Sequence, residues 1–461
     1  MPEISSKTIA VIGAGISGLC AAYWLNQKGM NVIVLERDSS AGGTMKTIRE
    51  NGWLVETGPN STLETTPLLS QLFDELGITD QRIYANEASN RRYILRNGKL
   101  HPLPMSTGAF LRSKLWSLPG KLRLMKEPFI GKVNKEESIA EFVERRLGRE
   151  FLDYAINPFV AGVYAGSPEQ LSVQAAFPKL YALEEKYGGL IRGMIRSRKE
   201  RKARKEVAKD RAKMFSFIEG MQTFPNAIAA RLGDSVELNC TVERIVPMRA
   251  GKYPVYTVSY VQDETRKTIE AQAVILAAPA HATAKIIQPI DPEMAKTLGA
   301  IYYPPVVEVF MGFRNNQIQR PLDGFGYLIP AKEKRSILGT IWSSAIFPNR
   351  APEGYEALTT FAGGARNPEL MTNDDEQMTD LVLSELKSVI NIDGEPAFIK
   401  VIRWPQAIPQ YNLGYYKVLK AMDMFEQNFR GAFFCSNFRG GIAVGDCVMS
   451  AEKVVEKIIQ L

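Results

Sequence analysis

Short apolar runs separated by glycine-rich segments predict the order of the elements at the start of the chain. Residues 9–12 form a β-branched run that is typical of a short strand. Apolar residues between positions 19 and 25 then recur at helical spacing until Gly29, where we expect the helix to end. Residues 32–35 form a second strand-like run, and Glu36 follows it. The pattern predicts a strand–loop–helix–strand unit.

The middle of the chain contains two regions with different patterns. From about residue 101 to 213 the sequence is mostly helical, with proline and glycine breaks. From about 282 to 398 the pattern is mixed, with one helix near 376–389 and strands at VVEVFMGF, GFGYLIP, SILGTIW and ALTTFAGG. Residues 235–246 alternate as one strand, and 274–278 form a buried strand. We therefore expect a helical insert and a sheet domain.

Length and composition are typical of a soluble globular protein with two or three domains. The chain has 461 residues, of which 45% are hydrophobic and 23% are charged. Its apolar runs are far shorter than the roughly 20 residues of a membrane-spanning helix, and its start lacks a signal-peptide layout. Four scattered cysteines and two histidines argue against a zinc site, and no metal is expected.

The two histidines restrict the catalytic classes to which the chain can belong. A Ser-His-Asp or Cys-His enzyme needs an imidazole base beside its nucleophile. His101 lies in KLHPLP and His281 follows AAPA, and neither is near a nucleophile motif. If the chain is an enzyme, we expect a cofactor to supply the difficult chemistry.

The glycine turn after the first strand predicts a dinucleotide site. Gly13 permits the tight turn, Gly15 lets the backbone approach a pyrophosphate, and Gly18 allows close packing of helix and strand. The helix N-terminus presents free N–H groups to the phosphates. Glu36, at the end of the second strand, can accept hydrogen bonds from both ribose hydroxyls and would repel a 2′-phosphate.

The segments RDSSAGGTMKT and GWLVETGPNS resemble the FAD-binding entry of the flavin amine oxidase superfamily. That family usually has an arginine two residues before its paired glycines, where this chain has Ser40 before Gly42 and Gly43. The C-terminal GAFFCSNFRGGIAVGDCVMS reads as a strand, a glycine loop and a helix with Asp446 near its start. In this superfamily such an end contacts the ribityl chain and the isoalloxazine. Both ends of the chain are therefore expected to build one FAD-binding domain.

The residues that we expect to contact FAD are Gly13, Ala14, Gly15, Ile16, Ser17, Gly18, Glu36, Arg37, Gly42, Gly43, Thr44, Gly58, Pro59, Asn60, Ser61, Val242, Trp404, Ile442, Ala443, Val444 and Asp446.

Motifs along the whole chain resemble the oxygen-dependent protoporphyrinogen oxidase family. They are GAGISGL, ETGPNS, LHPLP, AGVYAGSPEQLSV, APAHATA, DGFGYLIP, LGTIW, IPQYNLGY and GIAVGDC. The central motifs are more specific than the glycine turn, because amine oxidases share the ends but not these. Coproporphyrinogen III oxidases share nearly all of them.

The resemblance implies an α/β fold with a Rossmann-like FAD-binding domain, a mixed-sheet substrate domain and a helical insert that faces a membrane. The FAD-binding domain is expected at residues 1–88, 215–281 and 400–461. The substrate domain is expected at 89–100 and 282–399, and the insert at 101–214.

The reaction that the resemblance implies removes six electrons from a porphyrinogen. Hydride passes from a meso carbon to flavin N5, and O2 is reduced to H2O2, so no side chain is assigned as a catalytic base. An apolar slot with few polar anchors suits the macrocycle. By resemblance, the Gly162 carbonyl accepts from pyrrole N–H groups and Arg92, or the adjacent Arg91, pairs with a propionate. The other residues expected at the substrate are Asn60, Phe325, Leu328, Ile341 and Phe361.

Three alternatives stay open on the residues alone. The first is coproporphyrinogen III oxidase activity, and the second is a flavin amine oxidase or carotenoid desaturase. The third is a non-enzymatic binder on the same scaffold, like the GDP-dissociation inhibitors, which would give a colourless preparation.

A basic run at residues 196–213 carries the whole net charge of +7. It has no apolar stripe and no interleaved aromatic residues, so we expect no nucleic-acid binding. The remaining interpretations are a solvated segment and electrostatic attachment to an anionic membrane. We expect a cytoplasmic protein on the inner face of the cell membrane, and the family allows a homodimer and a hand-off of the porphyrin to ferrochelatase.

Overall fold

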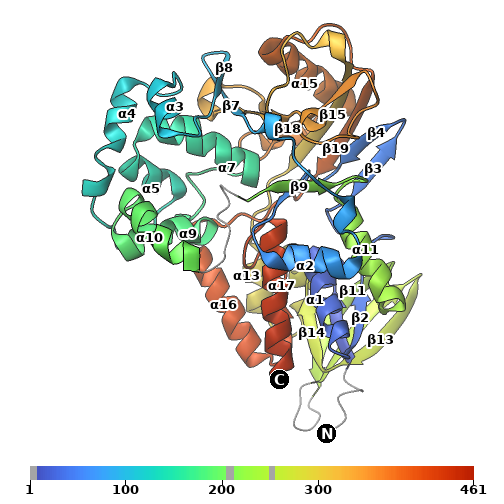
Figure 1. Ribbon diagram of the computed structural model, residues 1–461. Helices are drawn as coiled ribbons and strands as arrows, with labels where there is room; N and C mark the ends of the chain where they lie inside the picture. Colours follow the sequence, from blue (N-terminus) through green and yellow to red (C-terminus); the bar gives the residue numbers. More distant parts are fainter. Residues whose placement is uncertain (1–7, 204–211, 249–254) are drawn as a thin grey trace.

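The computed structural model describes residues 8–203, 212–248 and 255–461 and shows three parts in contact (Figure 1). Both chain ends lie in a lower α/β part, a second sheet with α15 lies above it, and a group of helices covers one side.

A parallel five-stranded sheet forms the centre of the lower part, in the order β10-β2-β1-β14-β20. One face packs against helices α1, α2, α11 and α17, and the other packs against the β11–β13 sheet with helices α12, α13 and α16. The strands are apolar along their length because both faces are covered. The bounds are β1 Thr8–Ile12, α1 Ile16–Gln27, β2 Asn31–Leu35, α2 Pro67–Leu76, α11 Thr223–Leu232, β10 Val236–Glu237, β11 Cys240–Met248, β12 Val255–Gln262, β13 Thr265–Ala271, β14 Ala273–Leu276, α12 Ala280–Ile287, α13 Pro292–Gly299, α16 Tyr415–Asn428, β20 Ala432–Phe434 and α17 Val444–Ile459.

Two sequence expectations in this part differ from the structure. The single strand expected at 235–246 is two strands, because Asn239 adopts φ 58° and turns the chain out of the parallel sheet between β10 and β11. The expected boundary at 282 falls inside α12, and α12 and α13 pack on β11 and α16 rather than on the upper sheet. Their short apolar runs do not distinguish helix from strand.

The upper part is a seven-stranded sheet in the order β19-β15-β18-β17-β16-β7-β8. All neighbouring strands are antiparallel except β16 and β7, which are parallel. Helix α15 covers one face, and the β3–β4 hairpin reaches the other through Trp53 and Val55. The bounds are β3 Thr47–Glu50, β4 Trp53–Glu56, β7 Arg92–Arg96, β8 Lys99–Pro102, β15 Val306–Arg314, β16 Gly326–Leu328, β17 Ile337–Ile341, α14 Ser343–Ile346, β18 Tyr355–Gly363, α15 Asp375–Ile390 and β19 Phe398–Trp404.

A small three-stranded sheet, in the order β5-β9-β6, lies between the two large ones (Figure 1). Its strands are β5 Thr62–Leu63, β6 Arg82–Tyr84 and β9 Met214–Phe217.

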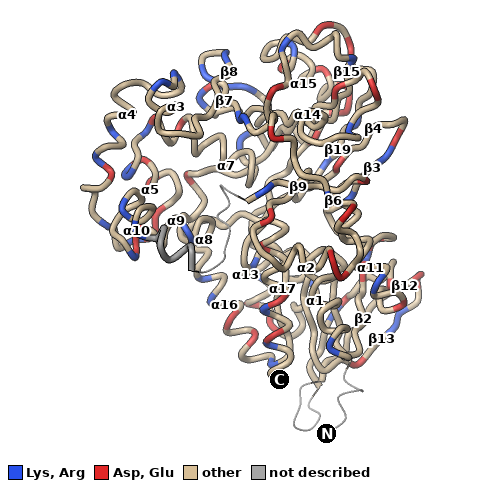
Figure 2. The backbone as a smooth tube through the Cα atoms, viewed as in Figure 1, with Lys and Arg blue, Asp and Glu red and all other residues tan. Residues whose placement is uncertain are grey.

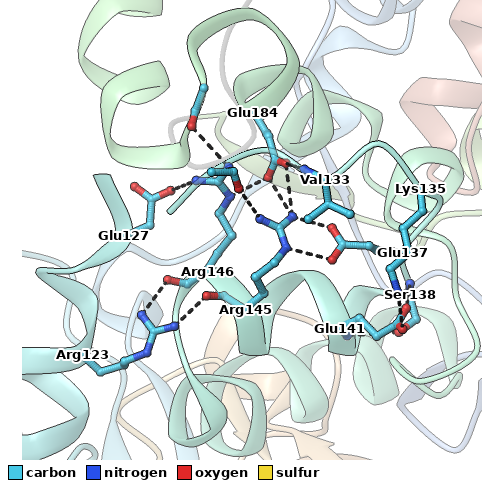
Figure 3. Close-up of polar contacts among 12 residues, drawn as sticks. Arg123, Glu127, Val133, Lys135, Glu137, Ser138, Glu141, Arg145, Arg146 and Glu184 are labelled. Carbon is cyan, nitrogen blue, oxygen red and sulfur yellow. Dashed lines mark hydrogen bonds and ion pairs between the residues drawn. The ribbon is translucent and has the colours of Figure 1, made fainter. Parts of the chain in front are cut away.

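The helical insert is held together by buried ion pairs (Figure 3). Arg146, which is 0% exposed, donates to Glu127 at 2.9 Å and to Glu184 at 2.5 Å. The carboxylate of Glu127 also accepts from the backbone N–H groups of Leu190 and Ile191, so it caps the first turn of α10. The helices are α3 Thr107–Arg112, α4 Leu118–Leu124, α5 Ile139–Arg146, α6 Arg149–Phe151, α7 Asn157–Tyr164, α8 Val173–Ala176, α9 Pro178–Tyr187 and α10 Leu190–Ala203, with one π-helical turn at Leu152–Ile156.

Candidate active site

The turn between β1 and α1 has the geometry of a phosphate cradle. A Cβ on Gly18 would lie 2.1 Å from the carbonyl oxygen of Gly13, so helix and strand meet here without room for a side chain. Gly13 adopts φ +105°, which disfavours other residues. A Cβ on Gly15 would meet nothing within 4 Å. The backbone at Gly15 therefore faces open space at the N-terminus of α1, where a pyrophosphate fits.

Glu36 is buried and is oriented by two backbone amides. Its carboxylate accepts from Ala14 N at 2.6 Å and from Asp38 N at 2.9 Å, one bond on each oxygen. A carboxylate oxygen has two lone pairs, so both oxygens can still accept from ribose hydroxyls. The start of β11 lies beside Glu36, since Cys240 N donates to the Glu36 carbonyl at 2.7 Å, and this places Val242 nearby. Arg37 is exposed and pairs with Asp38.

The paired glycines and the GP turn continue this site. Gly42 N donates to Ala14 O at 2.8 Å, and Gly42 bridges to Gly15, so the loop 41–44 lines the cradle. Gly58 lies so close to the loop that a Cβ would be 2.1 Å from Thr44 O. The Asn60 amide donates to Gly58 O at 3.2 Å, which keeps the turn of residues 58–61 compact.

The C-terminal glycine loop lies against the N-terminus of α1. The Cys435 thiol contacts Ser17 O at 3.8 Å, and Tyr411 holds the loop by donating to Asn437 O at 2.6 Å and accepting from Gly441 N at 3.1 Å. The loop, with Ile442 and Ala443, leads into α17, where Val444 and Asp446 lie in the first turn. Burial raises the pKa of the Cys447 thiol to about 11, so it is no thiolate nucleophile.

Three of the expected substrate residues, Leu328, Ile341 and Phe361, share one face of the upper sheet. Strand pairing puts Leu328 opposite Gly339 and Gly339 opposite Phe361, while Ile341 lies two residues further along β17. Side chains two residues apart point to the same side of a sheet. Trp404 belongs to the same face through β15, and its indole donates to Thr57 O at 2.6 Å. Leu328, Ile341, Phe361 and Trp404 are all only partly covered, which is the burial expected of an apolar slot.

The end of α7 reaches this face. A Cβ on Gly162 would lie 2.5 Å from the Leu328 Cδ2 atom, so the helix approaches the sheet at the glycine. Gly162 is among the last residues of α7, whose carbonyls have no partner within the helix. Gln410 fixes this end by donating to Tyr164 O at 2.8 Å. The last turn of α7, with Gly162, therefore lies directly against this face of the sheet.

The structure separates the two candidate arginines. Arg91 pairs with Asp323 at 2.6 Å, and Tyr93 donates to the same carboxylate, which holds Arg91 toward the α15 face. Arg92 has no ion pair among the described residues and lies 5.7 Å from the centre of the Phe325 ring. Arg92 is therefore the arginine that the fold leaves for a ligand carboxylate.

Neither histidine joins these groups. His101 lies in β8, and His281 lies in α12 with its ring edge-on to Tyr303. Burial lowers the pKa of both side chains. Within the described residues no group of three or more His, Cys, Asp or Glu could hold a metal ion.

Sequence reasoning missed three buried ionisable groups beside the site. Glu56, at the end of β4, lies 3.7 Å from the guanidinium of Arg350, and Glu308 is the third residue of β15. The only signal was a single glutamate inside the apolar run VVEVFMGF.

Comparisons with known proteins agree with this geometry. The model of the family "Flavin containing amine oxidoreductase" matches residues 16–459. Protoporphyrinogen oxidase 2 of Arabidopsis thaliana is 33% identical, with 99% of this chain and 94% of the relative covered. Coproporphyrinogen III oxidase of Bacillus subtilis (strain 168) is 28% identical over 97% of both chains.

The fold also matches solved structures. A protein from Exiguobacterium sp. 255-15 that was described as a candidate protoporphyrinogen oxidase superposes with a TM-score of 0.81 at 22% identity, over the full length of both chains. The cradle, the acid that faces it and the paired glycines fit FAD. The chain therefore belongs to the flavin-containing amine oxidoreductase family, with the protoporphyrinogen oxidases among its relatives, and it is an FAD-dependent oxidoreductase.

Proposed function

We propose that the protein oxidises protoporphyrinogen IX to protoporphyrin IX, with O2 as the electron acceptor and H2O2 as the product. The observation that carries the proposal is the apolar sheet face of Leu328, Ile341 and Phe361, which is closed by Gly162 and edged by Arg92. An apolar macrocycle with carboxylates at its rim matches this arrangement. The relatives' names point to the same substrate class.

Each part of the site has a separate task in this proposal. When bound, FAD would supply the group that accepts electrons from the substrate, and O2 is the final acceptor. The apolar side chains hold the macrocycle and exclude water, and the Gly162 carbonyl accepts from its pyrrole N–H groups. Arg92 pairs with a propionate, which fixes how the ring lies on the sheet.

Coproporphyrinogen III is the second candidate substrate, because the Bacillus subtilis relative is a coproporphyrinogen III oxidase. It carries two more carboxylates than protoporphyrinogen. The higher identity to the plant protoporphyrinogen oxidases favours protoporphyrinogen, at 33% against 28%.

The test is the appearance of porphyrin fluorescence when the FAD-loaded protein meets each porphyrinogen in air. We expect a rate above autoxidation and a larger kcat/KM for protoporphyrinogen, with H2O2 formed. Arg92→Ala should raise KM, whereas Arg91→Ala, which removes only the exposed pair with Asp323, should leave KM unchanged. A bound flavin with no turnover above autoxidation would contradict the proposal.

We further propose that the helical insert attaches the protein to an anionic membrane at the inner face of the cell membrane. Large apolar side chains are exposed on the insert together with Lys and Arg, along α4 and at the start of α10 (Figure 2). No helix in the described part of the chain is long and apolar enough to cross a bilayer. Away from α7, the exposed large apolar residues of the insert are Met105, Leu111, Leu118, Leu122, Met125, Phe129, Met194 and Ile195.

This attachment is separately testable with vesicles. Replacing Leu118, Leu122 and Phe129 by serine should weaken binding to anionic vesicles, while Met424→Ser on α16, which is exposed to the same extent as Leu122 but lies outside the insert, should not. Equal binding of all variants would refute the insert as the attachment surface. The side chains of most of the basic run, residues 197–211, lie outside the described residues. A hand-off to ferrochelatase and a homodimer stay proposals of the family resemblance.

A further inference from the structure

Glu308 is a buried carboxyl group that the fold does not use. It is the third residue of β15 and is 1% exposed. Its Oε1 atom has no hydrogen-bond partner within the described part of the chain. An unsatisfied buried polar group costs about 1–3 kcal/mol, so an apolar residue would make this strand more stable. A group retained at such a cost suggests a partner that is a ligand.

The strand register places Glu308 at the flavin side of the upper sheet. Its neighbours across the sheet are Phe361 on β18 and Ile402 on β19, and Trp404 lies two residues beyond Ile402 on the same face. The opposite face of β15, with Val307 and Val309, packs on α15. Glu308 therefore faces the FAD-binding part of the molecule.

On this face of β15, Glu308 lies between two segments that pack on its neighbours in the strand. Two residues before it, Val306 packs with the end of α7, and two residues after it, Phe310 packs with Trp53 of the β3–β4 hairpin. Strand β4 leads directly into the turn of residues 58–61, which faces the paired glycines. A ring held beyond the phosphate cradle, past this turn, would meet this face of the sheet, because Trp404 on the same face donates to Thr57 O at 2.6 Å.

The charges around Glu308 favour its neutral form. Burial, and secondly the carboxyl of Glu56, raise its pKa well above the usual range. The guanidinium of Arg350 lies 3.7 Å from the Glu56 carboxyl and also donates to Ser216 at 2.7 Å. Glu308 accordingly keeps its proton and presents an O–H donor.

We propose that Glu308, as a neutral acid, donates a hydrogen bond to the polar edge of the bound flavin ring. That edge carries two carbonyl oxygens and two unprotonated ring nitrogens, which are acceptors that a neutral acid can satisfy and a carboxylate cannot. A donor at this edge stabilises the negative charge that the ring gains on reduction. The inference rests on FAD binding and on the site described for the proposed function, and it adds a residue that sets affinity and potential.

The test compares Glu308→Leu, which removes the donor, with Glu308→Gln, which keeps one at nearly the same size. Both are measured without any porphyrinogen, by FAD titration of the apoprotein and by a redox titration. For Glu308→Leu we expect about tenfold weaker FAD binding and a tenfold shift of the redox equilibrium, which is a midpoint about 30 mV lower for two electrons. Glu308→Gln should stay close to the unmodified protein.

Glu385→Leu is the matched control. Glu385 is a buried carboxylate of α15, on the side of the sheet away from the flavin, and it pairs with Arg335 and accepts from Ser336 N. We expect this control to lower the stability of the apoprotein and to leave the potential unchanged. Glu308→Leu should instead raise the stability of the apoprotein and lower the potential.

Two results would overturn the inference. One is an unchanged potential and FAD affinity in Glu308→Leu, and the other is an unchanged potential with a raised KM for the porphyrinogen, since the carboxyl would then meet the substrate. If Glu308→Leu does not fold, Glu308→Met, which also lacks a donor, is measured in its place: a midpoint about 30 mV lower supports the inference, and an unchanged midpoint overturns it. A lack of porphyrinogen turnover with a shifted potential refutes only the proposed function.

Discussion

Two glycines of the same turn should respond in opposite ways to one added methyl group. Gly15→Ala adds a Cβ that meets nothing within 4 Å, whereas Gly18→Ala adds one 2.1 Å from the Gly13 carbonyl oxygen. Gly15 adopts φ −70° and ψ 170°, a conformation open to any residue. The first change therefore alters only the space that we assign to the pyrophosphate, and the second alters the packing of α1 on β1.

The expected magnitudes follow from these contacts. Gly18→Ala presses the new Cβ against a backbone oxygen, and no change of rotamer can relieve this contact. The free energy of unfolding should therefore fall by about 1–3 kcal/mol or more, as expected for overpacking. Gly15→Ala should leave the stability of the apoprotein within about 1 kcal/mol, because reduced unfolded-state entropy and a poorer N-cap oppose each other. Displacing the phosphate from charge-assisted N–H contacts costs about 1.5–3 kcal/mol, so FAD should bind roughly ten- to hundredfold more weakly.

The assay has two arms. Urea denaturation of the apoprotein measures the free energy of unfolding, and quenching of FAD fluorescence measures the dissociation constant. The reasoning is refuted if Gly15→Ala binds FAD as tightly as the unmodified chain, or if Gly18→Ala unfolds at the same urea concentration.

Three further changes test other parts of the molecule. Arg146→Met leaves the Glu127 carboxylate buried without its ion pair, which should cost about 3–5 kcal/mol of stability. Because Glu127 caps α10, hydrogen exchange in the first turn of α10 should become roughly hundredfold faster or more, and unchanged exchange would contradict the capping role. Burial raises the pKa of Glu56 to about 7, so the folded chain holds a proton that the unfolded chain loses from about pH 4.5. The free energy of unfolding should fall as pH rises through this window, and Glu56→Gln should flatten the fall in urea titrations. Gly162→Ala puts a methyl group 2.5 Å from the flexible end of Leu328, so the fold and FAD affinity should survive while KM for porphyrinogen rises about tenfold or more.

Local patterns predicted the parts of the fold that local physics determines. The β1–α1–β2 unit was readable because Gly13, Gly15 and Gly18 are required by one short turn. The helix expected near 376–389 is α15, which begins at a capping box on Asp374. The strand VVEVFMGF is β15, which pairs with β18 and β19.

Other features depend on residues far apart in the sequence. Whether Arg91 or Arg92 is left for a ligand depends on Asp323, which takes one of the two. The sequence shows Glu308 in an apolar strand, but it does not show that Arg350 pairs with Glu56 while Glu308 Oε1 has no partner among the residues that the structure describes. The partner of each buried or half-buried charged side chain depends on contacts between segments that are far apart in the sequence. Hydrophobic periodicity does not show these contacts.

The motif IPQYNLGY is one of the segments that carry the family resemblance, but its role could not be read from the sequence. Gln410, buried at 3% exposure, ties the end of α7 by its bond to Tyr164 O. The next residue, Tyr411, bonds the glycine loop at Asn437 and Gly441. Two adjacent side chains thus join the helix that would contact the porphyrinogen to the loop that would contact the flavin. The distance between the porphyrinogen and the flavin would therefore be set by hydrogen bonds that join residues 410 and 411 to residue 164 on one side and to residues 437 and 441 on the other. Segments far apart in the sequence are needed to build the site.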